Sequence, residues 1–149
     1  MQAFEGRCHC GNAQFRFDWP APVTALPVRA CGCDYCSMHG ARWTSHADAR
    51  CALTIEDDAQ ILRYRFGTGT ADFIVCTGCG VLIAAVCEVD GHARAVINAN
   101  TLEHIPLTVL DTAPTDFEGE AVDARLARRL RNWMPIEVMS EMTGEMTSP

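Results

Sequence analysis

The sequence predicts a mainly β fold of small packed sheets, followed by one amphipathic helix near the C-terminus. Short runs between residues 3 and 110 alternate apolar and polar side chains, and glycine and proline separate these runs. Between residues 120 and 134 the apolar period changes to that of a helix. With 149 residues, 48% hydrophobic and 21% charged, the chain suits a single globular domain.

The strand candidates share an alternating or a continuous apolar pattern, each bounded by turn-forming residues. An alternating run predicts a half-buried strand, whereas a continuous apolar run predicts a strand buried on both faces. The candidates are the alternating sets Phe15, Phe17, Trp19 and Leu62, Tyr64, Phe66, the continuous run 81–86, and the short segments 51–55 and 93–97.

The helix is predicted from apolar residues spaced by four, four and three, with arginines between them. Its apolar stripe is expected to pack on the sheet, its arginine-bearing face to be solvated, and its end to lie near Pro135. We therefore expect a domain over 3–110, an extension carrying the helix over 111–139, and a flexible tail over 140–149. The stripe is Val122, Leu126, Leu130 and Trp133, and the arginines are Arg125, Arg128, Arg129 and Arg131.

Charge and hydropathy exclude several classes of function. The net charge is −7, from 12 basic and 19 acidic residues, which argues against nucleic acid as a partner. No apolar run is long enough to span a membrane, so no membrane association is expected. Residues 1–5 lack the pattern of a signal peptide, which predicts a cytoplasmic protein. Self-association as a homo-oligomer is left open.

Nine cysteines are the unusual feature of this composition. In a reducing compartment, clustered thiols indicate metal ligands rather than disulfides. Cys51 and Cys87 stand alone and are expected to be small core residues. The other seven form three clusters: Cys8 and Cys10; Cys31, Cys33 and Cys36; Cys76 and Cys79.

The first and third clusters predict one structural zinc site. Each pair of thiols is separated by one or two residues, with glycine nearby, and each lies just before a predicted strand. Two such turns that meet across a sheet would give a closed site with four thiolates, which contributes to folding. The expected ligands are Cys8, Cys10, Cys76 and Cys79.

The middle cluster predicts a reactive zinc site, because Cys31, Cys33 and Cys36 have no fourth cysteine beside them. Three thiolate ligands donate negative charge to the zinc ion and make it a weak Lewis acid. Such an ion favours a soft fourth ligand, for example the sulfur of another thiol. Zinc holds a bound thiol as the thiolate, the nucleophilic form. The chemistry indicated is therefore that of a small thiol substrate.

Three alternatives remain for His39, which follows Cys36 by three residues. It could close the zinc site as a fourth ligand, act as the catalytic proton carrier, or be an ordinary surface residue. The three cysteines could also form a redox-labile cluster without metal. Arg42 is the candidate substrate-binding residue, and Trp43 beside it is expected to be core. No functional role is expected for His9, His46, His92 or His104.

The cysteine motifs resemble those of the glutathione-dependent formaldehyde-activating enzyme family, also called GFA/CENP-V. The similar segments cover roughly residues 3–110. They are Gly6-Arg7-Cys8-His9-Cys10-Gly11, Cys31-x-Cys33-x-x-Cys36, Cys76-x-x-Cys79-Gly80, residues 66–71 and residues 96–102.

The resemblance implies a β-tent organised around a structural zinc on the four-cysteine site, with a catalytic-type zinc on the three-cysteine site. It implies a carbon–sulfur lyase that joins glutathione and formaldehyde as S-hydroxymethylglutathione. The sequence thus predicts a lyase-like enzyme with two zinc ions that acts on a glutathione-like thiol. Two other functions stay open: a non-enzymatic zinc module that binds a partner, and a redox or metal-buffering protein.

Overall fold

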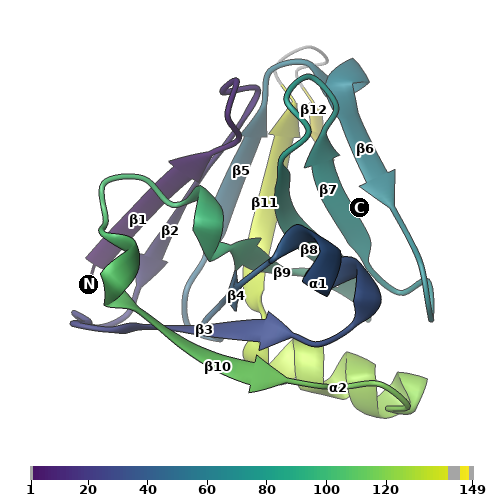
Figure 1. Ribbon diagram of the computed structural model, residues 1–149. Coiled ribbons are helices and arrows are strands. Elements are labelled where there is room, and N and C mark those ends of the chain that lie inside the picture. Colours follow the sequence, from purple (N-terminus) through teal and green to yellow (C-terminus); the bar gives the residue numbers. More distant parts are fainter. Residues whose placement is uncertain (1, 141–144, 148–149) are drawn as a thin grey trace.

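The chain folds as one connected β structure in the computed structural model, which describes residues 2–140 and 145–147 (Figure 1). The mainly β fold predicted from the sequence is confirmed. The main strand order is β1-β2-β5-β11-β9-β4-β3-β10; β8, β7 and β6 continue from β9, and β12 pairs with β11. The strands are β1 (Gln2–Arg7), β2 (Ala13–Trp19), β3 (Leu26–Cys31), β4 (Trp43–Thr44), β5 (Cys51–Ile55), β6 (Ile61–Tyr64), β7 (Asp72–Cys76), β8 (Leu82–Val89), β9 (His92–Asn98), β10 (Leu110–Thr115), β11 (Met134–Ser140) and β12 (Glu145–Thr147). The α-helices are α1 (Asp34–His39) and α2 (Val122–Asn132); short 3-10 turns cover Asp58–Gln60, Ala99–Thr101 and Leu107–Val109.

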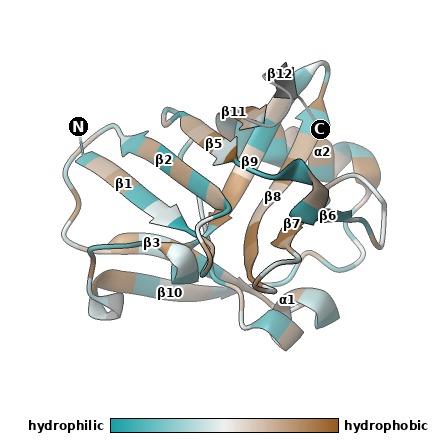
Figure 2. Cartoon of the chain, turned by 90° about the horizontal axis from the view of Figure 1, so that it is seen from above, coloured by the Kyte–Doolittle hydropathy of each residue, from teal (hydrophilic) through white to brown (hydrophobic). Residues whose placement is uncertain are grey.

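The N-terminal hairpin shows why the alternating pattern forms a strand. Phe15, Phe17 and Trp19 of β2 are buried, and the residues between them face outward. Phe4 of β1 stacks on Phe17 with ring centroids 5.4 Å apart. Figure 2 shows the same alternation as bands of contrasting hydropathy along β1 and β2. Burial of these aromatic rings makes this sheet a large part of the main core.

Strand β8 is central and buried on both faces, as its continuous apolar run predicts. Ile83 and Val86 belong to the main core, whereas Ala85 and Cys87 belong to a second cluster that contains Trp43. Much of β8 is brown in Figure 2, which agrees with its position between two apolar layers. Cys51, Cys87 and Trp43 are buried, as expected of core residues.

Strand β6 departs from the sequence expectation. Leu62 and Tyr64 were expected to face the core, but their side chains are 47% and 42% exposed. The strand pairs only with β7 in the described part of the chain, so it lies at an edge. Tyr64 lines an aromatic cavity in place of the core, and its ring stacks on Tyr35 with centroids 5.2 Å apart.

The C-terminal segment contains a strand that the sequence analysis does not predict. After α2, β11 enters the sheet parallel to β5 and antiparallel to β9. Of the expected tail over 140–149, residues 141–144 and 148–149 lie outside the described residues, and Glu145–Thr147 pairs with β11. Among the described helices, none has the length and hydrophobicity needed to cross a membrane.

Candidate functional site

Cys8, Cys10, Cys76 and Cys79 come together where the β1–β2 turn meets the β7–β8 turn. Their four sulfur atoms all lie within 4.8 Å of one another. The Sγ atoms of Cys8 and Cys10 are 3.8 Å apart, and those of Cys10 and Cys76 are 3.6 Å apart. Four thiols gathered at this spacing are a donor set that could hold a zinc ion.

The two turns have the same local construction. The N–H of Cys8 donates to the Ala13 carbonyl, and the N–H of Cys76 donates to the Val81 carbonyl, both at 3.0 Å. Gly11 and Gly80 take positive φ values of 84° and 80° in these turns, a conformation that suits glycine. Both turns thereby direct their thiols inward.

Burial and hydrogen bonding act in opposite directions on the thiols of this cluster. Burial raises the pKa of Cys8 to about 12. Burial also opposes ionisation of Cys79, but backbone N–H groups of Cys10 and Val81 donate to its sulfur and lower its pKa to about 6. The buried Asn12 amide donates to Cys76 Sγ at 3.9 Å. The N–H donors around the sulfur atoms favour thiolates, the form in which cysteine binds a metal ion.

Cys31, Cys33 and Cys36 form the second group, at the junction of β3 and α1. Their sulfur atoms also lie within 4.8 Å of one another. Cys33 is the N-cap of α1, and its sulfur accepts a hydrogen bond from the Cys36 N–H at 3.4 Å. The hydrogen bond with Cys36 lowers the pKa of Cys31 to about 5, and the same contact together with burial raises that of Cys36. Three thiols in this arrangement fit zinc chemistry.

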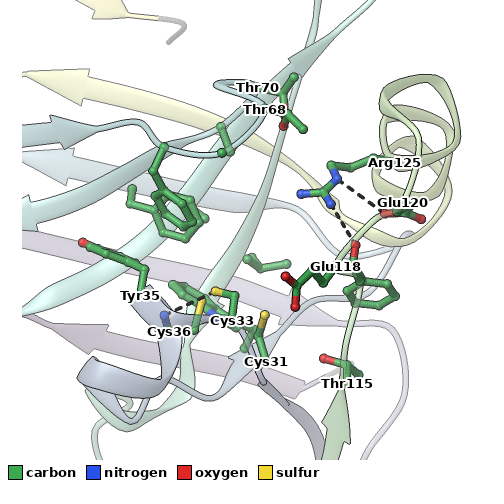
Figure 3. Close-up of a pocket in the computed structure, with 18 of the residues that line it drawn as sticks. Cys31, Cys33, Tyr35, Cys36, Thr68, Thr70, Thr115, Glu118, Glu120 and Arg125 are labelled. Atoms are coloured by element: carbon green, nitrogen blue, oxygen red, sulfur yellow. Dashed lines mark hydrogen bonds and ion pairs between the residues drawn. The ribbon is translucent and has the colours of Figure 1, made fainter.

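A cavity of about 810 Å³ opens directly on the three-cysteine group. Its apolar wall is aromatic: Tyr35 lies 4.9 Å from Phe66 and 5.1 Å from Phe73 between ring centroids. Trp43 and Tyr64 also line it. In Figure 3 the three labelled cysteines lie together on one side of the space, with Thr68 and Thr70 on another. The size and apolar lining suit a small organic molecule.

The segment between β10 and α2 adds polar groups to the cavity. Thr115, Glu118 and Glu120 line it, and Figure 3 shows the Glu118 carboxylate pointing into the space. Glu120 accepts three hydrogen bonds from Arg128, two from its Nε at 3.1 and 3.3 Å and one from its Nη2 at 3.1 Å. This pair ties the loop to α2, and Arg128 holds the pKa of Glu120 below its usual range.

The arginines of α2 correct a sequence expectation, because three of them do not form a solvated face. Arg125, Arg128 and Arg129 line the cavity, and Arg129 is only 6% exposed. Arg129 donates to the Thr70 hydroxyl at 2.7 Å and to Cys87 Sγ at 3.4 Å. Arg131 alone among the four stays exposed. The apolar stripe does pack inward at Leu126, Leu130 and Trp133, whereas Val122 is 44% exposed.

His39 and Arg42 do not themselves line the cavity. The exposed His39 imidazole packs against the Tyr35 ring with centroids 4.7 Å apart. Its nitrogen atoms do not belong to the group of possible metal ligands that Cys31, Cys33 and Cys36 form. Arg42 donates through Nε to the Asn100 side chain at 2.7 Å. The roles expected for both residues stay predictions. Neither lies in the lining of the cavity.

Sequence reasoning missed Arg29, Glu118 and the three cavity-lining arginines of α2 as parts of this site. Arg29 did carry a signal, since it precedes Cys31 by two residues and therefore faces the same side of β3. The arginines of α2 carried no signal of a site in the sequence, because their spacing is also that of the polar face of an ordinary amphipathic helix.

Comparisons with known proteins place these features in a family context. Residues 3–116 match the family described as "Glutathione-dependent formaldehyde-activating enzyme" (GFA). A solved structure described as that of a Rhodobacter sphaeroides protein is similar, with 24% identity and a TM-score of 0.56. That match covers 74% of this chain and 97% of the other, and it shows likeness of fold. No curated protein matches the chain. The family match ends before α2 and β11.

Proposed function

The chain belongs to the glutathione-dependent formaldehyde-activating enzyme family, and we propose that it catalyses the reversible addition of a small thiol to formaldehyde or a similar aldehyde. In this reaction the sulfur bonds to the aldehyde carbon, and the thiol proton passes to the former carbonyl oxygen. The reverse step breaks the same carbon–sulfur bond, which makes the activity lyase-like. Glutathione is the thiol that the family points to.

One observation carries the proposal: three free thiols within reach of a single ion border a cavity large enough for a tripeptide-sized thiol. Cys31, Cys33 and Cys36 would hold a catalytic-type zinc, and Cys8, Cys10, Cys76 and Cys79 a structural one. When bound at the three-cysteine site, zinc would supply a positive charge that keeps a thiol ionised near neutral pH.

The residues of the chain supply binding and proton transfer. Tyr35, Phe66 and Phe73 form an apolar wall that limits water around the reacting atoms. The reaction also needs a group that carries a proton between sulfur and oxygen. The Glu118 carboxylate points into the cavity, so its position favours it over His39 for this task.

The decisive experiment measures exchange between ¹³C-formaldehyde and its glutathione adduct by NMR, with zinc-loaded protein. We expect the wild-type protein to accelerate the exchange and Cys33→Ser to lose at least about 100-fold of that acceleration, about 2.7 kcal/mol in barrier height. Zinc content should fall from two equivalents to one in this variant. Cys51→Ala is the matched control, because Cys51 is a buried cysteine outside both groups.

Two results would contradict the proposal. Full exchange activity in Cys33→Ser would show that the three-cysteine group is not the reaction site. Two bound zinc ions in the wild type without any acceleration, for glutathione or other small thiols, would favour the non-enzymatic zinc module.

A further inference from the structure

The same cavity carries a group of arginines that the thiol–aldehyde reaction does not itself require. Arg29, Arg125, Arg128 and Arg129 line it, the first from β3 and the others from α2. We propose that Arg29 and Arg128 bind a carboxylate of the thiol substrate, so that α2, outside the family match, contributes to substrate selection. This inference rests on the proposed function, because it names a recognition site within the same cavity.

The placement of Arg29 links this subsite to the three-cysteine group. Arg29 and Cys31 project from the same face of β3, since side chains two residues apart share a face. Their Cα atoms are therefore roughly 7 Å apart. A thiol whose carboxylate lies several bonds from its sulfur can span the two positions, whereas an uncharged thiol gains nothing there.

Arg29 is the unpaired cation of the group. No hydrogen bond or ion pair joins its partly buried guanidinium to another described residue. It also borders a second hollow, which no carboxylate lines. Arg128, a second cation, lines the same cavity. A half-buried cation facing a like charge is unfavourable unless an anion joins them.

The other arginines are fixed in position but lack a full set of anionic partners. Arg125 and Arg128 share the single carboxylate of Glu120. The Arg128 guanidinium also lies 3.6 Å above the centre of the Phe117 ring. This contact orients the plane of the guanidinium and therefore the directions of its N–H donors. The Nε of the buried Arg129 has no hydrogen-bond partner in the described structure. Held guanidinium groups with free donors are suited to a carboxylate, which can accept two parallel hydrogen bonds.

The test compares glutathione with glutathione diethyl ester, which keeps the thiol and loses both carboxylate charges. Isothermal titration of zinc-loaded protein should give a dissociation constant about 10- to 100-fold higher for the ester. Arg29→Gln should weaken glutathione binding by a similar factor and leave ester binding nearly unchanged. Arg29→Lys should give an intermediate dissociation constant for glutathione, because lysine keeps the positive charge but lacks the two parallel N–H donors of a guanidinium.

Arg94→Gln is the matched control, since Arg94 is also partly buried but lies outside the cavity lining. Thermal unfolding without ligand supplies a second readout: Arg29→Gln should be as stable as the wild type or more stable, because it removes a partly buried cation that has no ion-pair partner among the described residues. Equal glutathione affinities for Arg29→Gln and Arg94→Gln would overturn the proposal. Inorganic phosphate bound as tightly as glutathione would overturn it as well, because the arginines would then be a site for free anions.

The two proposals fail in different ways. If glutathione binds with the expected dependence on Arg29 but no exchange with formaldehyde occurs, the reaction is wrong and the carboxylate subsite stands. If exchange is catalysed equally well with glutathione and its ester, at equal affinity, the reaction stands and the subsite is wrong.

Discussion

Cys8 and Cys76 occupy equivalent positions in two turns that face each other. The backbone N–H of Cys8 donates to the carbonyl of Ala13, which starts β2, at 3.0 Å. The backbone N–H of Cys76 donates to the carbonyl of Val81, which leads into β8, also at 3.0 Å. The turns belong to distant parts of the sequence, so their meeting joins β1 and β2 to β7 and β8. A metal ion shared between them would act as a cross-link within the fold.

Loss of the four-cysteine site is therefore expected to destabilise the protein far more than loss of the other site. Cys76→Ser should lower the free energy of unfolding by about 3 kcal/mol or more, because it would remove a buried thiol and, with it, the proposed structural zinc. Cys33→Ser should change it by about 1 kcal/mol or less, since Cys33 lies at the cavity wall. Urea unfolding of both variants measures the difference. Equal losses would contradict the structural role of the first site.

Glu118 and His39 are expected to differ in their effect on turnover. Glu118→Gln should lower kcat for the thiol–formaldehyde exchange by about 10²-fold if its carboxylate carries the proton. His39→Ala should keep kcat within about a factor of three, because His39 packs against Tyr35 outside the cavity lining. A large loss in His39→Ala with no loss in Glu118→Gln would return the proton transfer to the histidine.

Gly6 is expected to tolerate no side chain. A Cβ atom at this position would collide with the Phe15 ring and with the Thr101 carbonyl oxygen. Gly6→Ala should therefore cost about 1–3 kcal/mol of stability through overpacking. Gly32→Ala is the control, because its Cβ would meet the Thr115 carbonyl oxygen at an ordinary 3.4 Å. Thermal unfolding of the two variants should separate them, and similar melting temperatures would show that β1 can shift freely.

Glu120 is expected to make stability depend on acid pH. Its pKa lies below the ordinary value of 4.5 in the folded protein because Arg128 donates to it. The stabilisation is thus fully present above about pH 4.5 and is lost as the pH falls through the lower, folded pKa. Glu120→Gln should cost about 1 kcal/mol at pH 7 and progressively less below pH 4. Denaturant unfolding at several pH values, with the exposed Glu137→Gln as control, tests this dependence.

The sequence reveals the strands of this fold where one face meets the core and the other meets solvent. Phe15 and Phe17 fit that condition, and so the β2 prediction succeeds. Leu62 and Tyr64 show the same alternation, yet they face a cavity and an edge. Alternation marks which residues share a face, but it does not tell whether that face meets a core or a binding site.

Strand β11 was missed although its sequence alternates. Met134, Ile136 and Val138 are buried, but Pro135 suggested only the end of the helix. The proline is tolerated because pairing with β5 begins at Ile136, so its missing N–H interrupts no bond on that side. Similarly, the arginines of α2 could not be assigned from spacing, since only tertiary packing decides which side of a helix faces a cavity.

The position of β11 also has a consequence for synthesis on the ribosome. The strand lies between β5 and β9, yet it is translated after both of them and after α2. Until it emerges, β5 has an open edge and the two halves of the sheet lack their connecting strand. All seven clustered cysteines precede β11 in the sequence. A nascent chain can therefore expose every candidate metal ligand before the strand that joins the two halves of the sheet has been made.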